Sequence, residues 1–176
     1  FVEEGMRAIA DNGGKGARNY VTDICDGIAQ GHDGINYSLA HRDMMANMVE
    51  IHGNATGYDG GLFIASCDKS MPAMLMGIGK LKDMSAIVVT GGVMEAHTIP
   101  AKYVEQDPSC AINELLTLEQ IGKFDAQEKR GEIPKEQLDY YKQHACPSCG
   151  ACSFMGTAST MQIMAEALGL MLPGTA

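Results

Sequence analysis

Short apolar runs alternate with helical patterns along the first half of the chain. Residues 61–66 are an apolar run that predicts a buried strand. Residues 85–90 are apolar and β-branched and are stopped by Gly91 and Gly92, which predicts a second strand. Residues 19–24 are a third strand candidate, followed by a glycine-rich loop.

Helical spacing of apolar residues fills the segments around these runs. It predicts helices over residues 1–11, 38–52 and 72–81, with Ser38 as the N-cap of the second and Pro72 opening the third. Strands and helices therefore alternate. This order predicts an α/β fold with a largely parallel sheet covered by helices.

Further helical patterns follow in the second half of the chain. Residues 114–130 and 135–144 carry charged outer faces and predict two amphipathic helices, whereas residues 98–108 predict a loop. A last helix is expected to start near Thr157. Its predicted buried stripe consists of Met161, Met164, Ala165 and Leu168.

Composition argues against a nucleic-acid-binding or membrane-spanning protein. The 176 residues are enough for one domain with its own core, and the net charge of −9 argues against a nucleic-acid surface, which needs clustered Lys and Arg. No apolar run approaches the roughly 20 residues that span a bilayer, and no signal-peptide pattern opens the chain. We therefore expect a cytoplasmic protein. Both ends look cut, at Phe1 and Ala176, which suggests a piece of a longer protein.

Cys67, Asp68 and Lys69 place a thiol, a carboxylate and an amine on three successive residues. They follow a predicted strand and precede a predicted helix. Open α/β sheets usually keep their chemistry at the carboxyl ends of strands. These three residues are therefore the first candidates for a functional site.

A second group of thiols has the spacing Cys-x-x-Cys-x-x-Cys at Cys146, Cys149 and Cys152. Thiolates suit iron–sulfur clusters and zinc, and His144 could complete a zinc shell. In a chain without a secretory signal, six cysteines are more often metal ligands or reduced core thiols than disulfides. The sequence thus indicates an iron–sulfur or other metal-dependent enzyme, with a loop of buried thiols as the structural alternative.

Three segments carry motifs that occur together and in this order in one known family. They are Asp26-Gly27-Ile28 with Gly31-His32-Asp33-Gly34 and Tyr37-Ser38-Leu39, then Cys67-Asp68-Lys69-Ser70-Met71-Pro72-Ala73 with Gly77, then Cys152 through Thr157 to Gly174. The chain resembles the dihydroxy-acid and phosphogluconate dehydratase family over residues 1–176. The resemblance implies the N-terminal domain of a two-domain dehydratase.

This resemblance also implies two metal centres. Cys67 and Cys152 would be two of three cysteine ligands of an iron–sulfur cluster, [2Fe–2S] or [4Fe–4S], with the third cysteine upstream of this chain. Asp26 and Asp68 would be magnesium ligands, and Lys69 would bind the same ion as a carbamate.

The implied activity is that of a hydro-lyase, which dehydrates 2,3-dihydroxy carboxylic acids to 2-keto acids in valine and isoleucine biosynthesis. The family's proposed base lies in the C-terminal half, so this domain alone is expected to be inactive. The resemblance also suggests a homodimer. Two alternatives stay open: a dehydratase of aldonate or 6-phosphogluconate, and a non-catalytic zinc or cluster-binding module.

The candidate residues also have simpler interpretations. Asp26 precedes a glycine and could be a turn residue, and Asp68 and Lys69 could form an exposed ion pair. Cys149 could lie near a cluster without binding it. The other thiols are interpreted as core or incidental ones: Cys25 and Cys110.

Overall fold

A computed structural model describes residues 1–104 and 115–176, which belong to two compact units. Unit 1 consists of Phe1–Gly91 and Thr157–Ala176, and unit 2 consists of Gly92–Gly156. Cys110 and the expected helix start at residue 114 lie outside the described residues.

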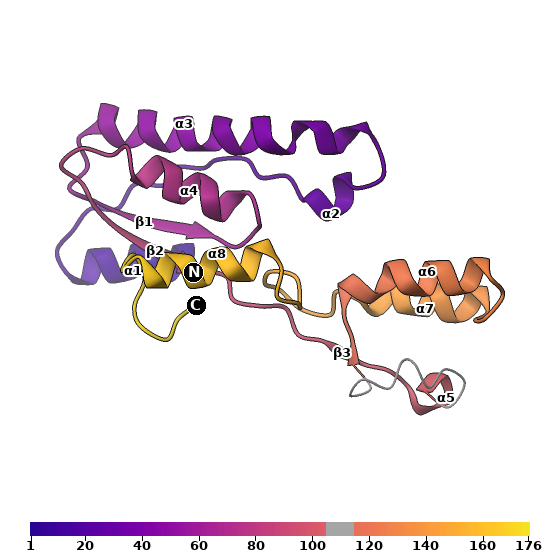
Figure 1. The fold of residues 1–176 in the computed structure, drawn as a ribbon. Coiled ribbons are helices and arrows are strands. Elements are labelled where there is room, and N and C mark those ends of the chain that lie inside the picture. The colour runs from indigo at the N-terminus through magenta and orange to yellow at the C-terminus, as the bar shows by residue number, and fades with distance from the viewer. Residues whose placement is uncertain (105–114) are drawn as a thin grey trace. The chain divides into compact units, whose positions relative to one another are not determined.

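Unit 1 has an α/β architecture. Its elements are α1 (Val2–Asp11), α2 (Asp26–Ala29), a 3₁₀ helix (Asp33–Tyr37), α3 (Ser38–Thr56), β1 (Gly60–Ala65), α4 (Ser70–Ile78), β2 (Ser85–Thr90) and α8 (Thr157–Ala167). The two strands are parallel, with Gly60 opposite Ser85 and Ala65 opposite Thr90. Figure 1 shows α3 and α4 on one side of the strands and α1 and α8 on the other. The predicted α/β fold with parallel strands is confirmed.

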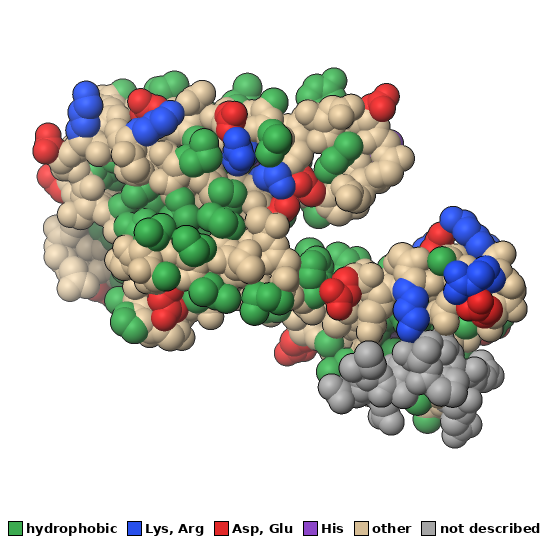
Figure 2. All heavy atoms as spheres, in the orientation of Figure 1, with side chains coloured by type: hydrophobic (Ala, Val, Ile, Leu, Met, Phe, Trp, Pro, Cys, Tyr) green, Lys and Arg blue, Asp and Glu red, His purple; other side chains and the backbone are tan. Residues whose placement is uncertain are grey.

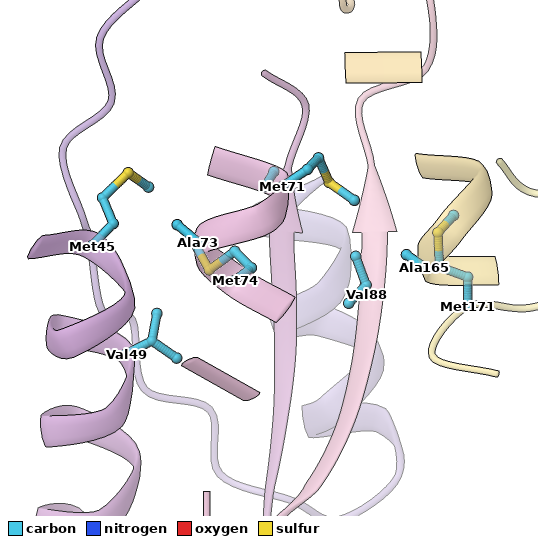
Figure 3. Close-up of a cluster of buried hydrophobic side chains, with 9 residues drawn as sticks. Met45, Val49, Met71, Ala73, Met74, Val88, Ala165 and Met171 are labelled. Atoms are coloured by element: carbon cyan, nitrogen blue, oxygen red, sulfur yellow. The ribbon is translucent and has the colours of Figure 1, made fainter. Parts of the chain in front are cut away.

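The core of unit 1 is built from small and flexible apolar side chains. Methionine packs adaptably into irregular gaps, which suits a core formed by helices and strands that meet at several angles. Figure 3 shows this cluster, which contains Met45, Val49, Met71, Ala73, Met74, Val88, Ala165 and Met171.

Local sequence signals determine where α3 ends and where α4 begins. The helix predicted over residues 38–52 continues to Thr56 and ends because Gly57 adopts the left-handed conformation, with φ of 64°. Pro72 lies in the first turn of α4, where a backbone N–H would have no helical partner in any case.

The strand predicted over residues 19–24 is wrong, because this segment pairs with no strand in the structure. Val21 packs against the core of unit 1, and Asn19 Nδ2 donates a hydrogen bond to the Tyr58 hydroxyl at 3.2 Å. An apolar residue in an extended segment can thus be buried without joining a sheet.

The buried stripe predicted for α8 is also wrong in part. Ala165 is fully buried, but Met164 is 48% and Leu168 60% exposed. Figure 2 shows hydrophobic side chains gathered on the surface where Figure 1 draws α4 and α8. The buried face of the helix consists of smaller and more polar residues: Ala158, Ser159, Gln162 and Ala165.

Unit 2 is mainly helical in its described part. Its elements are β3 (His97–Thr98), α5 (Ala101–Val104), β4 (Leu115–Leu116), a 3₁₀ helix (Leu118–Gln120), α6 (Ile121–Lys129) and α7 (Lys135–His144). The strands pair antiparallel, so the loop predicted over residues 98–108 contains a strand end and a short helix. The two predicted amphipathic helices are confirmed, although α6 begins later than expected. No helix in the described ranges is both long and apolar enough to cross a membrane.

The close approach of α3 and α4 gives a prediction for Gly77. A Cβ added there would lie 2.6 Å from the Val49 Cβ and 3.1 Å from the Ala46 carbonyl oxygen. We expect Gly77→Ala to destabilise unit 1 by about 1–3 kcal/mol, measured by urea unfolding, because the clash outweighs the gain in helix propensity. Gly79→Ala is the matched control, since the atom nearest to its Cβ is 3.5 Å away. Equal unfolding midpoints for both variants would contradict this account.

Candidate functional site

The turn after β1 is tied to the end of β2. Ser66 Oγ accepts a hydrogen bond from the Gly91 N–H at 2.9 Å, and Gln162 Nε2 donates to the Ser66 carbonyl oxygen at 3.4 Å. A Cβ at residue 91 would lie 2.1 Å from Ser66 Oγ, so a larger residue there would displace this hydroxyl from its hydrogen bond. The carboxyl ends of the two strands are therefore held together where the Cys-Asp-Lys segment begins.

The backbone of Cys67 is held from both sides by the start of α4. Ser70 Oγ accepts from the Cys67 N–H at 3.0 Å, and the Met71 N–H donates to the Cys67 carbonyl oxygen at 3.0 Å. The first bond is of the side-chain-to-backbone kind that occurs at helix starts, and the second continues the helical pattern back to Cys67. The thiol itself lies 3.7 Å from Asp68 Oδ1.

Lys69 joins two carboxylates from distant parts of the chain. Its Nζ lies 2.6 Å from Asp26 Oδ2 and 2.8 Å from Asp68 Oδ2. The side chains of Lys69, Asp26 and Asp68 are only 16%, 19% and 24% exposed. The simple interpretations, an exposed ion pair and a turn carboxylate, therefore do not describe these residues.

The electrostatics of this group are those of a partly buried ion cluster. Burial opposes the charge of Asp26, but hydrogen bonds from Lys69 and Ser38 outweigh it and lower the pKa of this carboxyl. Burial likewise opposes the charge of Lys69, and hydrogen bonds to Asp26 and Asp68 outweigh it and raise the pKa of the amine. The pKa shifts of Asp26 and Lys69 therefore both favour the charged forms of these two groups.

Cys67 has the opposite preference. Burial, followed by the negative charge of Asp23, raises the pKa of its thiol to about 12. A thiolate at this position is therefore unfavourable unless positive charge comes close to it.

One oxygen of the ion cluster has no hydrogen-bond partner among the described residues. Asp26 Oδ1 is buried, and no described residue shares a hydrogen bond with it. A buried acceptor without a partner costs about 1–3 kcal/mol. Carboxylate oxygens are the ligands that Mg²⁺ prefers, so the residues present fit a hard divalent cation. Asp26 and Asp68 supply two acidic ligands, and the described residues contain no group of three or more His, Cys, Asp or Glu that could hold a metal.

Unit 2 contains Cys152, the second predicted cluster ligand. It follows Ala151, whose N–H donates to the Gly92 carbonyl oxygen at 2.9 Å and whose carbonyl accepts from the Met94 N–H at 2.7 Å. Gly150 has φ of 119°, and a Cβ on it would lie 2.7 Å from the Met94 nitrogen. The backbone leading to Cys152 is thus fixed. That Cys152 shares a cluster with Cys67 of unit 1 stays a prediction.

The other thiols of the triplet are on the surface of unit 2. Cys146 and Cys149 are exposed, and neither forms a disulfide. His144, the possible zinc ligand, stacks on the Tyr140 ring at 4.0 Å, and its Nδ1 lies 2.7 Å from the Tyr140 carbonyl oxygen. It also lies against His97, with ring centroids 4.8 Å apart. In the described part of unit 2, the histidine and the cysteines do not form a group that could hold zinc.

The sequence did not reveal the serines that shape the site. Ser38 was expected to cap its own helix, but the N-cap of α3 is Tyr37, and the Ser38 hydroxyl donates to Asp26 Oδ2 at 2.9 Å. Ser70 contacts Cys67 in a comparable way. A serine at a helix start is a visible signal, but it does not say which acceptor or donor the hydroxyl will find.

Comparison with known proteins supports the resemblance found in the sequence. The family described as "Dihydroxy-acid/6-phosphogluconate dehydratase N-terminal" matches residues 1–176. A dihydroxy-acid dehydratase from Caldanaerobacter subterraneus subsp. tengcongensis is 42% identical over 151 residues, which are 86% of this chain and 25% of the relative. Another from Thermodesulfovibrio yellowstonii is 39% identical over 176 residues, which are 100% of this chain and 29% of the relative.

A third relative, from the archaeon Pyrococcus abyssi, is also described as a dihydroxy-acid dehydratase. It is 40% identical over 155 residues, which are 87% of this chain and 26% of the relative. The chain thus spans about a quarter of the length of the curated relatives it matches.

The raised pKa of Cys67 gives a prediction about reactivity. Because the thiolate is the reacting form, we expect iodoacetamide to modify Cys67 in metal-free protein far more slowly than the exposed Cys146 at mildly alkaline pH. The rate at Cys67 should keep rising with pH toward about 12, the value to which its pKa is raised. Peptide mass spectrometry measures both rates.

The control for this prediction is Asp23→Asn. It removes a negative charge that raises the pKa of Cys67, so alkylation of Cys67 should become faster at the same pH. A rate at Cys67 that does not depend on pH, or does not respond to Asp23→Asn, would show that access alone limits the reaction.

Proposed function

Because this chain belongs to the dihydroxy-acid and 6-phosphogluconate dehydratase family, as its N-terminal domain, we propose that the full-length protein is a hydro-lyase. It converts 2,3-dihydroxy carboxylic acids into 2-keto acids, with the acids of valine and isoleucine biosynthesis as substrates. The observation that carries this proposal is the ammonium of Lys69 held between Asp26 and Asp68, next to Cys67, at the end of β1.

The reaction needs help at two atoms of the substrate. A C2–H bond and a C3–O bond break, water leaves, and the resulting enol tautomerises to the 2-keto acid. The C2 proton is weakly acidic and hydroxide is a poor leaving group, so negative charge must be stabilised at both places. Hard oxygen ligands next to soft thiolate ligands would hold two different metal centres side by side, so that one substrate molecule can contact both.

Asp26 and Asp68 would hold the magnesium ion of this site. The ion, when bound, supplies positive charge that stabilises the enolate-like charge developing as the C2 proton leaves. Asp26 presents a buried oxygen that has no hydrogen-bond partner in the described part of the chain, which supports this role. Lys69 as an ammonium competes with a cation for the same carboxylates, whereas Lys69 as a carbamate would add an anionic oxygen to them.

Cys67 and Cys152 would hold the iron–sulfur cluster, together with a third cysteine from outside this chain. The cluster supplies a Lewis acid for the departing hydroxyl group. Cys67 supports the assignment because its backbone is fixed on both sides and its surroundings disfavour a thiolate without a nearby cation. We also propose a cytoplasmic location, since thiolate ligands need a reducing compartment. The homodimer suggested by the family resemblance is part of the same proposal.

An unphosphorylated substrate fits the site better than 6-phosphogluconate. The cation in the site is Lys69, and two carboxylates already neutralise it. Little positive charge is therefore left for a phosphate group, which normally binds to Arg or Lys clusters.

Metal content tests the site in the full-length protein purified without air. We expect Cys67→Ala to lose most of its bound iron and sulfide, because a cluster ligand is removed, and the exposed Cys146→Ala to retain them. Iron, sulfide and zinc analysis gives the readout. The reverse pattern, with metal lost from Cys146→Ala and kept by Cys67→Ala, would favour a zinc or cluster-binding module instead.

Substrate comparison tests the activity. We expect the metal-loaded, full-length enzyme to dehydrate 2,3-dihydroxy-3-methylbutanoate with a higher kcat/KM than an aldonate or 6-phosphogluconate, because Lys69 is already paired with Asp26 and Asp68 and is not free for a phosphate. A coupled assay of keto-acid formation measures all three. Faster turnover of the aldonate would replace the assignment with that of a sugar-acid dehydratase.

A further inference from the structure

The hydroxyl of Ser38 hydrogen-bonds to the ion cluster and not to the backbone of its own helix. It is the first residue of α3, its side chain does not cap that helix, and it is only 4% exposed. The hydroxyl donates to Asp26 Oδ2 at 2.9 Å across 12 residues of chain. A buried serine that connects two helices through one carboxylate oxygen fixes the rotation of that carboxylate.

The two oxygens of Asp26 consequently differ. Oδ2 accepts from both Ser38 Oγ and Lys69 Nζ, at 2.9 and 2.6 Å, whereas Oδ1 is buried and has no partner among the described residues. An oxygen that already accepts two donors has little capacity left for a cation. Asp26 therefore offers one oxygen for coordination.

We propose that Ser38 is a positioning residue that restricts Asp26 to one-oxygen coordination and thereby makes the site selective for Mg²⁺ over Ca²⁺. This inference rests on the proposed function, since it concerns the same cation. Mg²⁺ requires a near-octahedral shell at about 2.0–2.1 Å, whereas Ca²⁺ accepts carboxylates through both oxygens at about 2.3–2.6 Å. A carboxylate with one occupied oxygen suits the smaller ion.

We assign this role to Ser38 and not to Lys69 because the hydrogen bond from Ser38 can persist when a cation binds, whereas the bond from the Lys69 ammonium cannot. The Lys69 ammonium donates to Asp26 as well, but cation binding opposes an ammonium beside the same carboxylates. The serine hydroxyl carries no charge, so a cation does not repel it. It remains on Oδ2 when Lys69 withdraws or is modified.

Loss of the Ser38 hydroxyl therefore changes the type of coordination as well as its strength. With Oδ2 released, the Asp26 carboxylate can rotate and bind a cation through both oxygens. Affinity for Mg²⁺ should fall, and affinity for Ca²⁺ should fall less or rise. A purely structural role of Ser38 would weaken both cations equally.

The test uses the full-length enzyme, freed of divalent ions with a chelator and titrated calorimetrically with Mg²⁺ and with Ca²⁺. We expect Ser38→Ala to raise the ratio of Ca²⁺ to Mg²⁺ affinity roughly tenfold, as one hydrogen bond to a charged group allows. Ser38→Thr keeps a hydroxyl and should restore the wild-type ratio. Leu39→Ala, at an exposed neighbouring residue, should leave both affinities unchanged.

Mn²⁺ bound in place of Mg²⁺ gives a second readout that does not depend on turnover. Its electron paramagnetic resonance spectrum should change in Ser38→Ala and not in Leu39→Ala. Circular dichroism and thermal unfolding show whether Ser38→Ala folds, and Ser38→Cys is a closely isosteric second variant with a weaker donor, for which we expect an intermediate ratio.

The outcomes separate this inference from the proposed function. If the wild type binds Mg²⁺ and Asp68→Asn abolishes binding, but Ser38→Ala keeps the wild-type ratio and spectrum, the positioning role of Ser38 is wrong and the site stands. If the wild type binds no Mg²⁺ that depends on Asp26 or Asp68, both proposals are wrong.

Discussion

The Lys69 ammonium lies between the carboxylates of Asp26 and Asp68, and this contact organises the chemistry of unit 1. Asp26 begins α2, 43 residues before Lys69, so the contact joins the glycine-rich loop to the turn between β1 and α4. Two carboxylates held together in a partly buried place require a cation. Removing the amine without replacing it would leave like charges facing each other, which is strongly unfavourable. A lysine that satisfies this need in the absence of metal keeps the loop in place, and the pair of carboxylates still has one negative charge in excess.

The parallel strands position this group through short polar contacts. Ser66 links the end of β1 to Gly91 after β2, and Ser70 fixes Cys67 from the first turn of α4. Small hydroxyl side chains suit such places because they saturate backbone groups without filling the space above them. The functional groups at residues 67–69 thus start from a fixed backbone, while buried methionine and valine side chains hold the helices against the strands.

The alternation of strands and helices could be predicted because buried strands and amphipathic helices leave different hydrophobic periods in the sequence. The contact of Asp26 with Lys69 could not be predicted in this way, because the two residues are 43 positions apart and a contact at that distance leaves no periodic pattern in the sequence. Only the resemblance to a family placed Asp26 in the site. Ser38 was assigned to its own helix because capping is a local rule, whereas its actual partner is on another element. The buried face of α8 could not be predicted from its apolar residues for the same reason. Gln162 is buried and its amide donates to the Ser66 carbonyl, whereas Leu168, just after the helix, is exposed. Patterns indicate which elements form, and contacts between elements decide which polar groups are used.

The proposed hard and soft ligands on adjacent residues would also couple metal binding to protons. The ion pairs of Lys69 raise the pKa of its amine and keep it charged, but Cys67 keeps its proton because burial and nearby carboxylates raise the pKa of the thiol to about 12. A thiol becomes a metal ligand only when it loses that proton, so uptake of a cation by Cys67 must release a proton to solvent. The same negative surroundings that hold the thiol neutral would attract a cation able to deprotonate it. The neutral thiol is a poor nucleophile and a poor target for oxidants, which would protect the proposed ligand in the metal-free chain.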